Sequence, residues 1–524
     1  MRRTLIPVAA AVVLVGTAGC TASNPAGAGP STTSTGVTLT VDIASDVETL
    51  DPAVTIDNAS WKITYPAYEH LVGYKGASTD IVPELAQSWS SSSDGKVWTF
   101  KLAPGHKFSD GSTVDAAAVK FSFDRLLKIN QGPAGSFAEV AKVEAPDPTT
   151  VTFTLTSPFA AFPSTLATNY ASIVNPKVMD HQTNGDQGQA YLANHTMGSG
   201  PYELLSHVKG QSLTLVLNPK YAGPKPSITK AVFQIVSDPS AQRLQLEKGD
   251  VDIAEGITVD QLKPLESAPG ITVVQKPSLL VDYVYLNVGK GNPALKSTQV
   301  RQAISYAIDY KGLIDASQQG MATQMRGPIP QGMWGHDDSL LQYSYDPAKA
   351  AQLLASAHVG TIAPLTLLYS DHEPWWPTEA LAIQANLQKV GIPVKLSKVE
   401  YATERQLLDK GQFDLALGVW SPDYADPYMF MNFWFDSKNG GLAGNRAFYS
   451  NPQVDSLIRK AAVTPDQATR EQLYQQAQQI VVNDPPYVYL YQTNFLLPMR
   501  SNVTGFEFNP MLQGIYNLAQ MNKS

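Results

Sequence analysis

Segments typical of strands and segments typical of helices alternate along almost the whole chain. Residues 37–43 alternate apolar and polar side chains, the period of a strand with one buried face. Residues 116–127 instead place Val119, Phe123 and Leu126 at helical spacing. This order of elements predicts an α/β fold. Because roughly 490 residues follow the N-terminal segment, too many for one core, two or three domains are expected.

The same patterns predict most of the remaining elements. Residues 413–420 are apolar nearly throughout, as in a strand buried on both faces. The other predicted strands are 98–102, 151–155, 213–217, 231–235, 249–253, 365–369 and 487–497, and the other predicted helices are 240–248, 298–318, 378–390 and 466–483.

The N-terminus has the layout of a cleavable export signal over residues 1–20. Arg2 and Arg3 precede an apolar run at 5–15, and Thr17-Ala18-Gly19 are small. The segment resembles a bacterial lipoprotein signal in which Cys20 is lipidated, although Thr17 stands where that signal usually has leucine. An ordinary signal peptide with an incidental cysteine is the alternative, and the general secretory and twin-arginine routes both stay open.

Residues 21–36 carry no charge and are rich in Ser, Thr, Ala, Gly and Pro, which predicts a flexible linker. We therefore expect an extracytoplasmic protein, lipid-anchored to the outer face of the cell membrane. No later apolar stretch is long enough to cross a bilayer, so the body is expected to be soluble.

Composition excludes several classes of function. The formal charge of −8 becomes −10 without Arg2 and Arg3, and no basic stripe with interleaved aromatics is present, which argues against nucleic acid as a partner. Cys20 is the only cysteine, so disulfides contribute nothing to stability. The 8 histidines are scattered, and neither a metal nor another cofactor is expected.

A series of short motifs, in order, points to one family. They are 46–52 (Asp46 to Pro52), 83–89 (Pro-Glu-Leu-Ala-Gln-Ser-Trp), 93–95 (Ser-Asp-Gly), 98–102, 107–111, 198–202 (Gly-Ser-Gly-Pro-Tyr), 218–221, 248–252, 300–309 and 420–427 (Trp-Ser-Pro-Asp-Tyr-Ala-Asp-Pro). Each is weak alone, and several of them, such as 93–95 and 198–201, read physically as turns or bends. In order, they resemble the peptide/nickel-type (family 5) solute-binding proteins of bacterial ABC importers, the oligopeptide- and dipeptide-binding class.

The resemblance implies a two-lobe periplasmic-binding-protein-like fold with a ligand cleft. Lobe one would comprise residues 37–285, with an inserted α/β subdomain at about 76–195, lobe two residues 286–490, and residues 491–524 would return to lobe one. Hinge crossings would fall near 283–287 and 489–494, and the lobes would close over the ligand. The implied partners are a solute or peptide and the permease subunits of the importer, with the protein itself a monomer.

The first candidate site follows the buried strand 413–420, at its carboxyl end, where open α/β sheets bind ligands. In peptide-binding relatives the aspartate at the position of Asp423 receives the peptide's α-ammonium group, and a carboxylate suits that role. The alternative is a turn aspartate bonded to its own backbone. Trp420 is a pocket wall or a core residue, Tyr424 is a further candidate, and Asp426 is expected to be a turn residue.

Two more loops complete the candidate site. Residues 370–377 hold His372, Trp375 and Trp376, and one of the two tryptophans should face the cleft. Residues 55–61 hold Asn58, Ser60 and Trp61, which in relatives would line the cleft, while Asn58 or Ser60 could instead cap a helix.

The ligand class stays open at this point. Dipeptide-binding relatives place an arginine near the loop 370–377, where this chain has Asp371, His372 and Glu373. This difference argues against a free dipeptide and leaves a longer peptide, another cationic solute, a sugar or a metal chelate open. A glycoside hydrolase using paired carboxylates such as Asp371 and Asp423, or a surface receptor, is the alternative, but no catalytic motif is found and no enzyme is expected.

Overall fold

The computed structural model describes residues 36–524. The predicted signal, Cys20 and the linker up to residue 35 lie outside the described residues. Within residues 36–524, none of the helices combines the length and the apolar composition needed to cross a bilayer.

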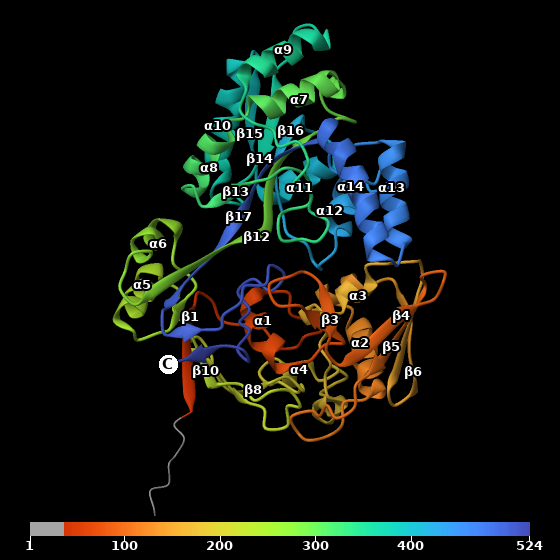
Figure 1. The fold of residues 1–524 in the computed structure, drawn as a ribbon, viewed down its shortest axis with the longest axis vertical. Coiled ribbons are helices and arrows are strands. Elements are labelled where there is room, and N and C mark those ends of the chain that lie inside the picture. Colours follow the sequence, from red (N-terminus) through yellow and green to blue (C-terminus); the bar gives the residue numbers. More distant parts are fainter. Residues whose placement is uncertain (1–35) are drawn as a thin grey trace, which may run out of the picture. The chain divides into compact units, whose positions relative to one another are not determined.

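An eleven-stranded mixed sheet runs through the described part of the chain (Figure 1). Its strands follow the order β15-β14-β16-β12-β17-β11-β1-β10-β9-β8, with β13 paired to β17 beside this path. The bounds are β1 Val37–Ile43, β8 Tyr202–Val208, β9 Ser212–Leu217, β10 Ile228–Ile235, β11 Ile253–Ala254, β12 Ile271–Leu286, β13 Ala322–Gln324, β14 Leu365–Tyr369, β15 Val394–Lys398, β16 Leu415–Trp420 and β17 Tyr487–Arg500. The prediction of an α/β fold is confirmed.

Strands β12 and β17 connect the two halves of this sheet. They pair antiparallel from Ile271↔Arg500 to Tyr285↔Tyr487, and Figure 1 shows them running together from one group of elements to the other. At one end β17 pairs with β11, and at the other end β12 pairs with β16. We call the elements on the β11 side lobe one and those on the β16 side lobe two.

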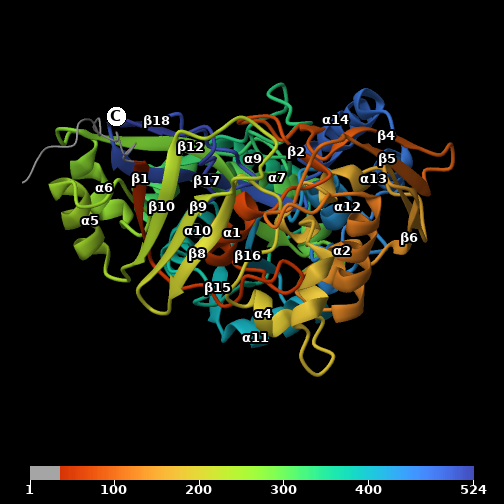
Figure 2. The same ribbon diagram turned by 90° about the horizontal axis from the view of Figure 1, so that it is seen from below.

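Lobe one contains the parallel strands β1, β10 and β11, followed by antiparallel β9 and β8, which Figure 2 shows from below. Its buried face includes Leu39, Val41, Leu213 and Phe233. The helices α1 (Asn58–Thr64), α5 (Pro239–Lys248) and α6 (Val259–Leu265) belong to this lobe, as do the C-terminal strands β18 (Val503–Thr504) and β19 (Asn522–Lys523). Lys523 Nζ donates to the Thr38 carbonyl at 2.9 Å, so the chain ends on lobe one.

A separate antiparallel sheet lies within residues 72–173, with the strand order β4-β5-β7-β6. Its core is built on Phe100, Phe123, Phe153 and Phe162. The elements are β2 Val72–Tyr74, β3 Ile81–Pro83, β4 Ala86–Ser91, β5 Val97–Leu102, α2 Ala116–Ile129, β6 Val140–Asp147, β7 Thr150–Leu155 and α3 Phe162–Thr165, followed by α4 Gln189–Leu192. This sheet falls in the range predicted for the inserted subdomain.

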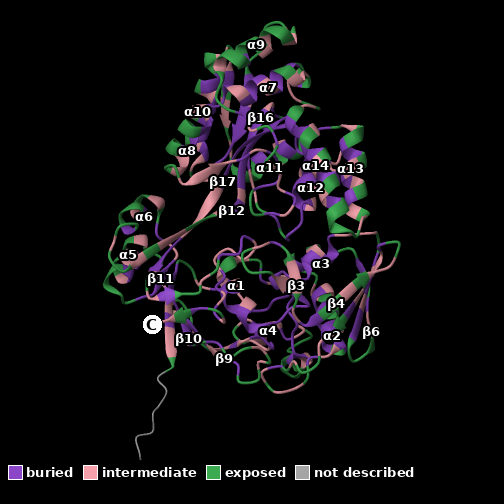
Figure 3. Cartoon of the chain, viewed as in Figure 1, coloured by how far each residue is buried: buried purple, intermediate pink, exposed green. Residues whose placement is uncertain are grey.

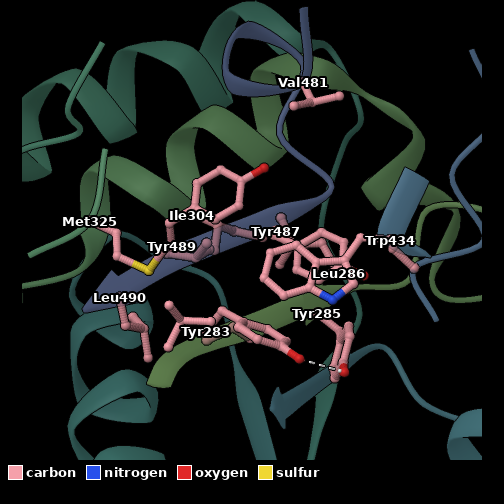
Figure 4. Close-up of a cluster of buried hydrophobic side chains, with 14 of the residues drawn as sticks. Tyr283, Tyr285, Leu286, Ile304, Met325, Trp434, Val481, Tyr487, Tyr489 and Leu490 are labelled. Carbon is pink, nitrogen blue, oxygen red and sulfur yellow. Dashed lines mark hydrogen bonds between the residues drawn. The ribbon is translucent and has the colours of Figure 1, made fainter. Parts of the chain in front are cut away.

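Lobe two surrounds the parallel strands β14, β15 and β16 with helices. Their bounds are α7 Thr298–Ala307, α8 Tyr310–Gln318, α9 Pro347–Ala357, α10 Trp376–Lys389, α11 Tyr401–Lys410, α12 Tyr428–Phe435, α13 Pro452–Val463 and α14 Gln467–Asn483. An aromatic cluster fills the core, where the Tyr283, Trp434 and Tyr487 rings lie 4.8 to 5.3 Å apart (Figure 4). Exposed residues gather on the outward faces of the helices (Figure 3).

Two predicted elements differ in the structure. The helix expected over 298–318 is two helices, because Ile308 is extended (ψ 125°) and Asp309 caps α8 by accepting from Gly312 N. The strand expected over 249–253 is reduced to β11, because Gly249 ends α5 in the left-handed conformation (φ 82°).

The expected hinge at 283–287 lies within regular pairing of β12 with β16. The β12–β17 register instead shifts between Pro277 and Val281, opposite Asn494 and Gln492, and again between Asp282 and Tyr283. The lobe boundaries given by the sequence stay a prediction.

Candidate ligand-binding site

The candidate site lies at one edge of the sheet in lobe two. Strands β14 and β16 are parallel, with Leu367 opposite Leu415, so both end at the same edge. Strand β12 runs the other way and pairs Val281 with Trp420, so Val281 lies at that edge too. The loops after β14 and β16 therefore emerge side by side, as a ligand site in an open α/β sheet requires.

Asp423 lies in the loop after β16 with its side chain exposed. Its carboxylate has no hydrogen-bond or ion-pair partner among residues 36–524, in contrast to the turn interpretation of this residue. Protein atoms nonetheless crowd it at longer range, and this partial desolvation raises the pKa of the Asp423 carboxyl. Such a group is suited to bind a cation.

Tyr170 of lobe one lies near Asp423. Burial, with a contribution from the Asp423 charge, raises the pKa of Tyr170 to about 12. The Tyr170 ring lies edge-on to Trp61, with 5.4 Å between ring centroids. Trp61 and Asp423, which are 362 residues apart in the sequence, are therefore linked through Tyr170, which the sequence did not single out.

Trp420 precedes Asp423 in the sequence and Tyr424 follows it. The two aromatic side chains have different surroundings. Tyr424 is buried and packs edge-on against Phe159 of lobe one, 6.0 Å between centroids. Trp420 is half-buried and stacks on Phe433 at 4.6 Å, and its indole Nε1 has no partner among the described residues. Trp420 can thus form a wall while one face is held by α12.

The tryptophan pair after β14 divides between two roles. Trp375 is half-buried, and its Nε1 donates to Asp282 Oδ2 at 2.8 Å. Trp376 is only 2% exposed and belongs to the core of lobe two, and its role as a ligand contact stays a prediction. Trp376 lies beside His372 and Asp282, and Trp375 is the more exposed of the two tryptophans.

A buried acidic group anchors Trp375. Asp282 is fully buried, and burial raises its pKa, with further contributions from Glu379 and Glu373. Glu379 is also buried, its pKa is raised by burial to about 7, and it accepts a hydrogen bond from Tyr491 Oη. The sequence signal for Asp282 was one acidic residue inside the apolar strand β12.

Two further candidates occupy different positions from those predicted. Ser60 is fully buried and its hydroxyl donates to Asp57 Oδ2 at 2.7 Å, and its contact with ligand stays a prediction. Asp57, rather than Asn58 or Ser60, caps α1, since its Oδ1 accepts from Ser60 N at 2.8 Å. Asn58 is exposed, and the exposed His372 stacks on Tyr401 at 4.0 Å between ring centroids.

An arginine distant in sequence lies behind the loop after β14. Arg446 is buried and donates from Nη1 to Tyr285 Oη at 2.7 Å. Burial raises the pKa of Glu404, while Ser370, the first residue of that loop, and Arg446 lower it. Arg446 therefore brings a positive charge near the loop that no arginine in the local sequence supplies.

The two lobes also meet beyond Asp423. Asp426 forms a buried double hydrogen bond with Arg470, at 2.8 and 2.6 Å. This pair borders a cavity of about 340 Å³ between the lobes, lined by Trp334 of lobe two and by Trp89 and Trp98 of lobe one. Asp426 thus has an internal partner, whereas Asp423 does not. Among residues 36–524, no group of three or more His, Cys, Asp or Glu is arranged to hold a metal ion.

Comparisons with known proteins agree with this architecture. Residues 80–441 match the model of the bacterial extracellular solute-binding proteins, family 5. The chain is 49% identical over 491 residues to the probable D,D-dipeptide-binding periplasmic protein of Escherichia coli (strain K12), covering 93% of this chain and 94% of that one. This relative is named as a binding protein rather than as an enzyme.

Two solved structures share the fold. HbpA2 from Haemophilus parasuis superposes with a TM-score of 0.86 at 26% identity, over 93% of this chain and 100% of that chain. The periplasmic binding protein DppA from Helicobacter pylori, in complex with the peptide STSA, gives 0.72 at 29% identity, over 93% and 98%. The predicted two-lobe fold and the predicted family are both confirmed. This chain belongs to the bacterial extracellular solute-binding proteins of family 5, the class that captures solutes for ABC importers.

Proposed function

We propose that this protein binds a short peptide through the peptide's α-ammonium group at Asp423 and delivers it to the permease subunits of an ABC importer. The observation that carries the proposal is the exposed Asp423 carboxylate, which has no partner among residues 36–524 and lies near Tyr170 of the other lobe. An ammonium group would supply the missing charge-assisted hydrogen bonds.

The first peptide to test is a D,D-dipeptide. The relative that is 49% identical over 93% of this chain is named as a probable binder of D,D-dipeptides. Trp375 and Trp420 would form walls around a small ligand, and Trp61 with Tyr170 would close it from lobe one. Arg446 is a cation on the lobe two side that could attract the peptide carboxylate, through a small rearrangement around Tyr285.

Titration calorimetry on the full mature protein tests the proposal with D-Ala-D-Ala, L-Ala-L-Ala and N-acetyl-D-Ala-D-Ala. Removing one partner of a desolvated charge pair typically costs about 2–5 kcal/mol, so Asp423→Ala should weaken dipeptide binding by roughly 30-fold or more. Acetylation removes the same charge from the ligand and should have a similar effect on the wild type. It should have little further effect on Asp423→Ala.

Wild-type affinity in Asp423→Ala, or equal affinity for the acetylated dipeptide, would contradict the ammonium assignment. If a neutral oligosaccharide binds and the peptides do not, the natural ligand would be assigned as a sugar instead of a peptide. Mass spectrometry of the ligand that co-purifies from cells provides an independent identification.

We further propose that the mature chain begins at a lipidated Cys20 and is held on the outer face of the cell membrane. The support is the signal-like segment before the only cysteine of the chain. One acyl chain gives marginal binding, so stable attachment needs the several chains of a lipoprotein. Cys20→Ala should move the protein from the membrane fraction to the soluble fraction, and an unchanged membrane fraction would contradict the anchor.

A further inference from the structure

A cavity of about 300 Å³ lies within lobe one, away from the residues of the candidate site. It is bordered by the turn Tyr65–Ala67, by the hairpin of β2 and β3, and by the C-terminal segment 507–520. None of the ligand-site candidates Asp423, Trp375, Trp420 or Trp61 lines it. We call it the tyrosine pocket, because Tyr65, Tyr74 and Tyr221 form part of its wall.

The charged side chains that line this pocket are all acidic. They are Glu84 and Glu507, and among the described residues no Lys, Arg or His contributes to the lining. The potential in the pocket is therefore negative, and the faces of tyrosine rings add to it. A cation is favoured over an anion or a neutral solute.

Glu84 has unused capacity as a hydrogen-bond acceptor. Its Oε1 accepts from the backbone N of His70 at 3.1 Å, and its Oε2 lies 3.7 Å from His70 Nδ1. The Glu84 side chain is 29% exposed, so a solute can reach it. A carboxylate offers about four lone-pair sites, and most of those on Glu84 are unoccupied.

Tyr65 and Tyr221 lie close to this carboxylate. Burial and the charge of Glu84 both raise the pKa of Tyr65. Burial, with contributions from Glu69 and Glu84, raises the pKa of Tyr221 to about 12. The Tyr74 hydroxyl is shielded from solvent and has no hydrogen-bond partner among the described residues. Tyrosine side chains and a carboxylate with unoccupied acceptor sites thus border one small volume.

We propose that the tyrosine pocket is a second binding site, for a primary alkylammonium cation. Its N–H groups would bond to Glu84, and its alkyl carbons would lie against the tyrosine rings. A volume of about 300 Å³ is at the lower end of small-molecule sites, which matches an amine of a few carbons. The proposal is independent of the peptide proposed for Asp423.

The test uses n-butylammonium, with n-butanol as a neutral probe of the same length. Saturation-transfer NMR is recorded on the Asp423→Ala protein, so that binding of an amine at Asp423 does not contribute. We expect saturable binding of n-butylammonium and much weaker binding of n-butanol. Glu84→Gln keeps the acceptor for His70 N and should weaken amine binding roughly tenfold or more. Tyr74→Leu, which removes one ring and hydroxyl, should also weaken it.

Folding of these variants is checked on the wild-type background by the melting temperature and by dipeptide affinity, which Glu84→Gln should leave unchanged. No saturable amine binding to Asp423→Ala, or equal binding to Asp423→Ala and Asp423→Ala/Glu84→Gln, would overturn the proposal. Equal binding of n-butanol would show an apolar pocket and would also overturn it. A failed dipeptide titration with intact amine binding would instead contradict only the function proposed for Asp423.

Discussion

The indole Nε1 of Trp375 donates a hydrogen bond to Oδ2 of Asp282 at 2.8 Å. This bond joins the loop after β14 to strand β12, one of the two strands that connect the lobes. Asp282 is fully buried, so the bond forms where water does not compete for it. Trp375, which is proposed to contact ligand, is thereby held by Asp282, and Asp282 lies beside the register shift of the β12–β17 pair.

Trp375→Phe keeps an aromatic ring but removes the donor to Asp282. We expect the melting temperature to fall, because a lost hydrogen bond to a buried acceptor destabilises a protein by about 1–3 kcal/mol. Dipeptide affinity should fall severalfold, because the aromatic side chain at position 375 is no longer held in place by Asp282. Trp376→Phe is the comparison, because Trp376 also lies beside Asp282 but its Nε1 makes no direct hydrogen bond among residues 36–524. A larger loss of affinity in Trp376→Phe than in Trp375→Phe would reverse the assignment of the two rings.

Asp42 on β1 makes stability depend on pH. It is fully buried, neither carboxylate oxygen has a partner among the described residues, and burial raises its pKa from 3.8 to about 7. The folded state therefore holds a proton that the unfolded state has released, and the free energy of unfolding falls as pH rises from about 4 to 7. Asp42→Asn should raise stability at pH 8 by about 1–3 kcal/mol and have little effect at pH 4.

Asp46→Asn is the control, because the Asp46 carboxyl changes stability with pH in the opposite direction to Asp42. Burial alone would raise the pKa of Asp46, but hydrogen bonds from Gly210, Val47 and His207 together lower it. This carboxylate stabilises the folded state above pH 4, and that contribution is lost as pH falls through its folded-state pKa. Calorimetric melting temperatures of both variants at pH 4, 6 and 8 check the two signs. An Asp42→Asn curve parallel to that of the wild type would contradict the role given to Asp42.

Asp426 and Asp423 should differ in what they control. Asp426→Ala leaves the buried guanidinium of Arg470 without its partner, which typically destabilises a protein by about 3–5 kcal/mol. Dipeptide affinity, measured below the melting transition, should stay within about twofold of the wild type. The pair Asp426→Leu/Arg470→Met removes both charges and should recover much of the stability. Recovery of neither stability nor affinity would show that the ion pair has a direct role in binding.

Local patterns predicted the strand before Asp423, because β16 is apolar on both faces and ends at a polar, proline-containing loop. They could not place Asp282 or Tyr170 beside that loop, since strand pairing and lobe contacts bring these residues in from distant parts of the chain. The break between α7 and α8 was missed for a different reason. Both helices bury apolar side chains, so the periodicity continues across Ile308, and only the cap formed by Asp309 marks the new start.

The last prediction concerns closure of the lobes. We propose that the hinge lies at the register shift between Pro277 and Val281 of β12 and at Gln492–Asn494 of β17, rather than at 283–287. On the far side, Phe159 of lobe one packs edge-on against Tyr424 and Tyr428, at 6.0 and 5.4 Å between centroids. Ala160 N also donates to the Ala462 carbonyl at 2.9 Å.

If these contacts favour the closed form, a saturating dipeptide should reduce the radius of gyration measured by X-ray scattering. Phe159→Ala should weaken dipeptide binding by roughly tenfold, because ligand affinity falls with the fraction of molecules able to close. Tyr191→Ala is a control, since Tyr191 stacks between His181 and His195 within lobe one. A ligand is first verified by calorimetry to bind. Identical scattering curves with and without that ligand would then exclude closure. Wild-type affinity in Phe159→Ala, with closure still observed, would place the stabilising contact at Thr79 and Trp334, where Trp334 N donates to Thr79 Oγ1 at 3.1 Å.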